Sequence, residues 1–254
     1  MAGIVELLLK HDPDAASKVI DNQSRQLPLH IACGCYKEQL DVVKTLYDAY
    51  PEAIRVRDGQ GKLPLDLARE GNMDKIVDFF QTQLVYAQQA QDTTAMHTLD
   101  ENGWLPLHHA IKDNAPLGSI KLLVKGNPSA IRTADGNLAF PLHIACQFST
   151  VKVVKYLVEL DSRIPVGRLD MNNDSVLHYA CRGGNLEVIK YLMGSSTSRV
   201  SDTNADNKLP FHLLIEYDDE QVRESIEFTE ACFQLLRVHP ETVTNLTSRK
   251  RRRD

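Results

Sequence analysis

The sequence has few of the features that mark a membrane, secreted or disulfide-bonded protein. No apolar run approaches the roughly 18 residues that a membrane span needs, so we expect no membrane insertion. The stretch from Met1 to Glu6 lacks a basic region and carries a carboxylate, so we expect no signal peptide. The chain holds only five cysteines, and their spacing does not indicate disulfides. A reducing compartment is therefore expected.

Motifs of enzymes are also missing. The sequence has no Gly-x-Ser-x-Gly, no phosphate-cradling glycine loop and no His-Glu-x-x-His. Cys33 and Cys35 form a Cys-x-Cys without a matching pair, which argues against a zinc site. We therefore predict a protein that is not an enzyme, with no cofactor, no bound metal and no small-molecule substrate.

Outside one segment at the C-terminal end, acidic residues outnumber basic residues. Five of the 29 basic residues and one of the 34 acidic residues lie in 249–254, and the rest of the chain has a net charge of −9. An acidic body is a poor partner for nucleic acid. The tail from Arg249 to Arg253 is interpreted as a solvated end, or alternatively as a nuclear-import or acidic-surface-binding segment. Nucleic-acid association through this tail is a weaker hypothesis. We expect a cytoplasmic location, or a nuclear one if the tail is an import signal.

What the chain does contain is one motif in six copies. The motif reads Leu-Pro-Leu-His in its clearest form, and its proline position falls at residues 28, 64, 106, 141, 176 and 210. Such a period predicts one helical unit, copied and stacked. The motif residues assigned a structural role are Pro28, His30, Pro64, Pro106, His108, Pro141, His143, His178, Pro210 and His212.

Each copy reads as two short helices. The proline suits the first turn of a helix, because its φ is fixed and it has no amide to donate. A second apolar cluster follows about a dozen residues later, as in Val153 to Leu157, with apolar residues at i, i+1 and i+4. The residue three positions before the motif proline is Gly or Asn in four of six copies, which predicts a turn with positive φ.

The histidines repeat in register, which raises the question of whether histidines of neighbouring repeats bind a metal ion together. Stacked repeats lie about 10 Å apart, too far for two imidazoles to share a zinc ion at about 2 Å each. We therefore expect each histidine to bond the backbone of its own or a neighbouring turn. Asp66 replaces the histidine in the second copy, so that bond should change there.

The pattern Asp-x-x-Gly-x-x-Pro-Leu-His-x-Ala, present from Asp100 to Ala110, resembles the ankyrin repeat, with Leu mostly replacing the usual Thr. The resemblance covers nearly the whole chain. It implies an all-α ankyrin-repeat solenoid, in which a β-turn precedes two antiparallel helices. The expected division is a partial repeat at 1–21, repeats at about 22–57, 58–99, 100–134, 135–169, 170–203 and 204–248, and the tail at 249–254.

Several departures from the repeat stand out. The second copy is longer near Gln81 to Gln91, which predicts a longer second helix or loop. The sixth is extended between Glu216 and Glu230. Val176 stands where the proline should be, so we expect that helix to begin less sharply. Residues 2–10 read as a second helix without a first, which fits a fragment of a longer array or a poorly capped short one.

By this resemblance, binding would use the turn tips and the inner helices, on the concave side of the array. The candidate partner-binding residues are Gln26, Lys62, Glu101, Asn102, Trp104, Lys112, Asp113, Gln147, Phe148, Arg182, Lys208 and Tyr217. Trp104 is the only tryptophan and occupies a variable turn position. It is either a binding hot spot or a cover for the neighbouring turn.

The sequence thus predicts a scaffold or adaptor that binds another protein of unknown identity. The alternative is a regulatory or targeting module of a larger enzyme or channel.

Overall fold

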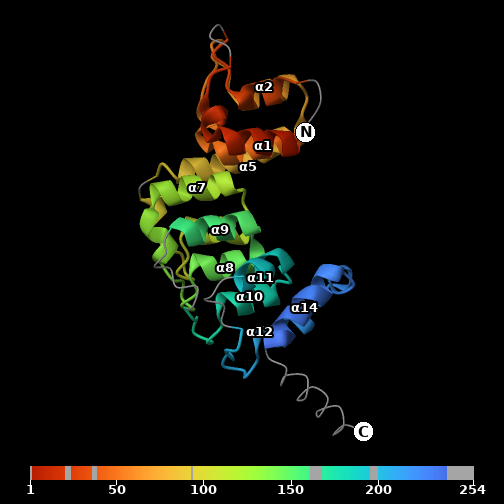
Figure 1. The fold of residues 1–254 in the computed structure, drawn as a ribbon. Helices are drawn as coiled ribbons and strands as arrows, with labels where there is room; N and C mark the ends of the chain where they lie inside the picture. The colour runs from red at the N-terminus through yellow and green to blue at the C-terminus, as the bar shows by residue number, and fades with distance from the viewer. Residues whose placement is uncertain are drawn as a thin grey trace. The chain divides into compact units, whose positions relative to one another are not determined.

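The computed structural model describes residues 2–20, 24–35, 39–92, 94–160, 168–194 and 200–238, and these are all-α (Figure 1). The basic tail at 249–254 lies outside them. The chain divides into two compact units, which are described separately. Unit 1 comprises Met1–Thr98 and Ala115–Pro128, and unit 2 comprises Leu99–Asn114 and Ser129–Asp254.

Unit 1 contains α-helices and short 3-10 helices. They are α1 (Ala2–His11), η1 (Pro13–Ser17), α2 (Pro28–Gly34), α3 (Leu40–Ala49), η2 (Pro51–Arg55), α4 (Pro64–Glu70), α5 (Asp74–Gln89), η3 (Ala95–His97) and α7 (Leu117–Gly126). The inner helices α2 and α4 pack on each other, and α1 packs on α3. Pro13 and Pro51 begin η1 and η2, two residues after the preceding α-helix ends.

Unit 2 consists of α-helices and, among its described residues, one 3-10 helix. Its helices are α6 (Pro106–Lys112), η4 (Pro128–Arg132, of which Pro128 is assigned to unit 1), α8 (Pro141–Phe148), α9 (Val151–Leu160), α10 (Val176–Arg182), α11 (Leu186–Met193), α12 (Pro210–Ile215), α13 (Glu220–Arg223) and α14 (Ile226–Val238). The inner helices α6, α8, α10 and α12 form one row. The outer helices α9, α11 and α14 form a second row.

An acidic or amide side chain shapes the turn before five of the inner helices, α4, α6, α8, α10 and α12. Asp58, Asp100, Asp135, Asp170 and Asn204 lie six residues before the first residue of the helix that follows. The Oδ1 atom of each accepts the backbone N–H groups two and four residues later, at 2.7–3.1 Å. This Asx-type bonding holds the turn closed.

The residue three before the helix start adopts positive φ in all six turns. Gly and Asn tolerate this conformation well. Arg25, at 49°, and Leu138, at 60°, adopt it as well, although neither residue type favours positive φ. Neighbouring turns are also joined by backbone bonds. In unit 2, the N–H of Gly136 donates to Asn102 and the N–H of Met171 donates to Asn137, at 2.9 and 2.8 Å.

The prediction that the helix at Val176 begins less sharply than the others was wrong. Helix α10 begins at Val176, the same motif position at which the other inner helices begin. The preceding Ser175 is the reason, since its hydroxyl accepts the N–H of His178. A serine cap therefore replaces the preorganised φ of proline as the start signal.

The motif histidines bond two successive loops, which is the structural role that their position predicts. In His30, His108, His143 and His178, Nδ1 accepts the N–H of the residue before the helix, at 3.0–3.2 Å. This fixes the proton on Nε2, which donates to a carbonyl 25–30 residues later at 3.1 Å. His212 makes the first of these bonds at 2.9 Å.

Asp66 reproduces only the first half of this arrangement. Its Oδ2 accepts the N–H of Leu63 at 2.9 Å and so begins α4 in the same way. An ionised carboxylate has no proton to donate, so Asp66 cannot bond a later carbonyl as the histidines do.

Burial keeps three of the histidines neutral. Desolvation lowers the pKa of His108, His143 and His178, outweighing the opposite effect of their backbone bonds. Protonation would also place a second N–H opposite the backbone donor that Nδ1 accepts. The folded chain therefore favours the neutral imidazole.

We expect the fold to weaken in mild acid for this reason. The unfolded chain, with histidine pKa values of about 6.5, takes up protons before the folded chain does as the pH falls. The stabilisation is complete above about pH 6.5 and is lost below it. Urea unfolding followed by circular dichroism should therefore give a lower midpoint at pH 5.5 than at pH 7.5.

His143→Gln should reduce this pH dependence and lower the free energy of unfolding at pH 7.5 by about 1–3 kcal/mol, because its two backbone partners lose their bonds. His11→Gln, on the surface of α1, serves as the control and should change neither. Equal midpoints of the unaltered chain at the two pH values would contradict the argument.

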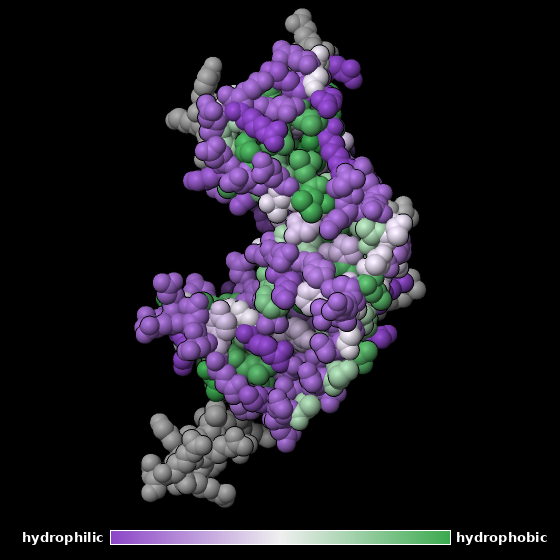
Figure 2. All heavy atoms as spheres, turned by 180° about the vertical axis from the view of Figure 1, so that it is seen from behind, coloured by the Kyte–Doolittle hydropathy of each residue, from purple (hydrophilic) through white to green (hydrophobic). Residues whose placement is uncertain are grey.

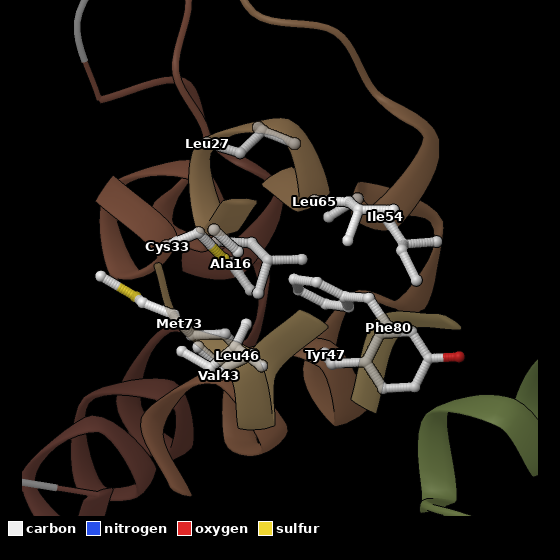
Figure 3. Close-up of a cluster of buried hydrophobic side chains, with 14 residues drawn as sticks. Ala16, Leu27, Cys33, Val43, Leu46, Tyr47, Ile54, Leu65, Met73 and Phe80 are labelled. Atoms are coloured by element: carbon white, nitrogen blue, oxygen red, sulfur yellow. The ribbon is translucent and has the colours of Figure 1, made fainter. Parts of the chain in front are cut away.

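The core of unit 1 contains a polar contact that joins three outer helices. Figure 3 shows Tyr47 at the edge of the buried apolar cluster, with its ring beside Phe80 and its hydroxyl pointing away. That hydroxyl lies 2.9 Å from the hydroxyl of Ser119, which donates to Gln83 at 2.6 Å. Tyr47, Gln83 and Ser119 are all buried, on α3, α5 and α7. Burial raises the pKa of Tyr47 to about 12, so the phenol stays protonated.

Helix α7 thus packs on α3 as well as on α5, although α3 belongs to the expected first repeat and α7 to the third. Gly118 allows the close approach, because a Cβ there would lie 2.7 Å from the Tyr47 ring. Asp48 accepts the N–H of Gly118 at 2.8 Å, and Lys121 donates to the Asp48 carbonyl at 2.7 Å. The added residues in the second copy lengthen α5 to 16 residues, against ten each in α3 and α7.

Ser119→Ala should destabilise unit 1 by about 1–3 kcal/mol, because it leaves the Tyr47 hydroxyl and the Gln83 amide buried without this partner. Urea denaturation measures the change. Ser17→Ala, which removes an exposed hydroxyl, is the matched control. A loss no larger than that of the control would show that the buried network contributes nothing.

Candidate protein-binding surface

The candidate residues fall on both units. Gln26 and Lys62 lie in unit 1, and the other ten lie in unit 2. In unit 1, the Gln26 amide donates to Asp58 of the next turn at 3.3 Å. Lys62 forms an ion pair of 2.7 Å with Glu70 at the end of α4. Both side chains are half-buried and held by their own array, which limits their reach toward a partner.

Trp104 is the centre of a cluster on unit 2. Its indole Nε1 donates to Oδ2 of Asp135 in the next turn at 3.0 Å. The Lys112 ammonium lies 5.0 Å from the centre of the ring, within range of a cation–π interaction. His109 presents its ring edge at 5.1 Å and bonds Asp100 at 2.9 Å. Trp104 is therefore half-buried and held in one orientation, with part of its surface accessible.

Asp100, one of the carboxylates beside Trp104, accepts hydrogen bonds within the turn that contains Trp104. The backbone N–H of Trp104 bonds Asp100, and this bond is the largest cause that holds the pKa of Asp100 below its usual value. The carboxylate therefore stays ionised at neutral pH. The cluster combines an aromatic ring, a lysine and two carboxylates, which suits recognition of a polar surface with one apolar or cationic anchor.

Further along unit 2, the candidate side chains are tied to neighbouring residues. Arg182 pairs with buried Asp174 and lies 5.2 Å from the Tyr179 ring. Lys208 pairs with Glu216 at 2.7 Å. Tyr217 lies against Gly184, whose φ is +61° and where a Cβ would meet the ring at 2.4 Å.

The remaining candidates are more accessible. Glu101, Asn102, Lys112 and Asp113 are exposed, and Gln147 is half-buried. Phe148 is 42% exposed, so it does not fold into the core. On the face drawn in Figure 2, hydrophilic side chains predominate and hydrophobic ones form separate patches. Phe148 is one of several large hydrophobic side chains that are exposed among the described residues, so its exposure alone does not single it out.

Sequence reasoning missed the partners that hold these side chains. Asp135 and Asp174 bridge neighbouring turns, since Asp174 also accepts the amide of Asn204 at 2.9 Å. Tyr179, like His109, bonds the aspartate of its own turn. The signal was available, because Asp recurs six residues before the motif proline position in four of the six copies.

Within the described residues, no helix is both long and apolar enough to cross a bilayer. The same residues contain no group of three His, Cys, Asp or Glu side chains placed to hold a metal ion.

Comparison with known families decides what kind of array this is. Family models described as ankyrin repeats (many copies) match residues 8–68 and 142–193. The chain is an ankyrin-repeat protein. Ankyrin repeats are protein-interaction modules and are typically not catalytic. No curated protein matches the chain significantly.

The tryptophan of this ankyrin-repeat protein reports on its own cluster. Asp135→Asn keeps the Oδ1 acceptor that closes the turn but replaces the Oδ2 acceptor of the indole with an NH2 group. It should shift the Trp104 emission to longer wavelength, because the indole loses its hydrogen bond and gains contact with water. Helical content should not change. Since Trp104 is the only tryptophan, steady-state fluorescence reads this site alone. Asp206→Ala, in an exposed turn of the same unit, is the control, and equal spectra for the two variants would refute the proposed orientation.

Proposed function

We propose that this ankyrin-repeat protein is a non-catalytic scaffold or adaptor, which binds another protein through the turn tips and inner helices of unit 2. The observation that carries the proposal is the geometry of Trp104. Its ring is partly accessible, and Asp135 and Lys112 hold it in place. A preoriented aromatic loses little side-chain entropy on binding, which is typical of interface hot spots.

A cytoplasmic site of action is part of this proposal. Cys33, Cys146 and Cys181 recur at one repeat position and are free and buried. Desolvation raises the pKa of all three thiols, so they act as small core residues without redox chemistry. Such unpaired thiols suit a reducing compartment.

An affinity pull-down from the lysate of the source cell tests the binding surface. The bait is either the intact chain or the triple variant Trp104→Ala, Lys112→Ala, Phe148→Ala. We expect a protein that the intact chain retains and the triple variant loses. For that protein, Trp104→Ala alone should weaken binding by more than about 1 kcal/mol, measured by calorimetry, with circular dichroism unchanged.

The matched control is Lys155→Ala with Glu159→Ala, two exposed positions on the outer helix α9. This variant should bind as well as the intact chain. If the triple variant retains every protein that the intact chain retains, binding does not use the turn tips and inner helices of unit 2.

A further inference from the structure

A hollow lies between two outer helices of unit 2, and no turn-tip residue lines it. It runs between α11 and α14, which are side by side in Figure 1. Leu186, Ile189 and Met193 of α11 and Ala231 of α14 supply its apolar lining. Its volume is about 710 Å³. Binding clefts commonly measure about 300–1,000 Å³, so the hollow has room for several side chains.

One end of the hollow is acidic. Glu187, near the start of α11, and Glu227, near the start of α14, line it, and both also line an adjoining shallow hollow. Asp219 and the exposed Phe148 complete that second hollow. Among the described residues, no lysine or arginine lines it. The three carboxylates therefore face a surface without a basic lining residue.

The other end differs in charge. Lys190 lies 3.9 Å from Glu230 across the first hollow. Arg237 lies ten residues beyond Glu227 on α14, which is about 15 Å along a helix. The groove thus has a direction, with carboxylates at its start, the Lys190–Glu230 pair among the apolar residues about one helical turn further on, and a guanidinium at its end.

The extension of the sixth repeat supplies much of this acidity. Between α12 and α14 it contributes α13 and the exposed carboxylates of Asp218, Glu220 and Glu224. An acidic rim attracts basic partners and repels acidic ones over several ångströms. Charge complementarity thereby identifies the kind of occupant.

We propose that this groove binds a basic amphipathic helix of a partner protein. Its lysine or arginine side chains would lie against Glu187, Asp219 and Glu227. Its apolar side chains would contact Leu186, Met193 and Ala231. Two neighbouring helices with an apolar floor offer the geometry in which a third amphipathic helix docks. The groove does not include Trp104 or Lys112, and it meets the surface proposed above only at Phe148.

A defined peptide tests this proposal on the full chain. The probe is a fluorescein-labelled helix with leucine at i, i+3, i+4 and i+7 and lysine elsewhere, and fluorescence anisotropy measures its affinity. A second probe carries glutamate in place of lysine. We expect the lysine probe to bind, more weakly as salt is raised, and the glutamate probe not to bind.

Variants of the chain locate the binding. Glu187→Lys with Glu227→Lys should lower the affinity about tenfold, the sum of two surface charge contacts. Met193→Asp should lower it to a similar extent. The matched controls are Glu101→Lys at a turn tip and Glu159→Lys on α9, which should bind normally. Circular dichroism confirms that each variant is folded.

Three results would overturn the proposal. Equal affinity for the charge-reversed and control variants would place binding elsewhere. Full affinity of Met193→Asp would show that the apolar groove takes no part. Binding of the probe only after removal of residues 249–254 would mean that the chain's own basic segment occupies the groove, so that assigning it to a separate partner is wrong.

Discussion

The stack depends on the pair of hydrogen bonds that the imidazole of a motif histidine makes to the backbone. One ring accepts the N–H that begins its own helix and donates to a carbonyl of the following loop. Because the backbone donor fixes the tautomer, the same residue sets both the start of a helix and its distance from the next repeat. The turn aspartates then add the contacts between neighbouring turns. Buried apolar side chains then pack between the helices that these hydrogen bonds position.

This dependence places a constraint on the binding surface. Gln26, Trp104 and Asp174 lie two residues before the start of an inner helix, and each bonds a turn residue of the next repeat. This turn position, whose residue type varies between repeats and which we expect to contact a partner, therefore also helps to hold neighbouring repeats together. Trp104 combines both demands, since its N–H is committed to Asp135 while part of its ring stays accessible.

Much of the fold follows from spacing in the sequence. The period predicted the paired helices, the prolines their starts, and the glycines and asparagines the positive φ of the turns. The error at Val176 arose because a serine hydroxyl can replace proline as a start signal, which a proline-based pattern overlooks. The contact of Ser119 with Tyr47 lies between residues 72 positions apart, and a repeat pattern describes only neighbours. The candidate binding residues stay predictions, because their use depends on the surface of a partner that this sequence does not encode.

The packing of α7 on α3 has a consequence for how such a chain evolves. Repeat arrays usually grow and shrink by duplication or loss of whole units, since each unit contacts only its neighbours. In unit 1, the Tyr47–Ser119–Gln83 network draws one member from each of three successive outer helices. Removing or doubling the middle unit would break it. This part of the array is therefore fixed in its number of units, while the regular stretch from α8 to α11 remains free to change in length.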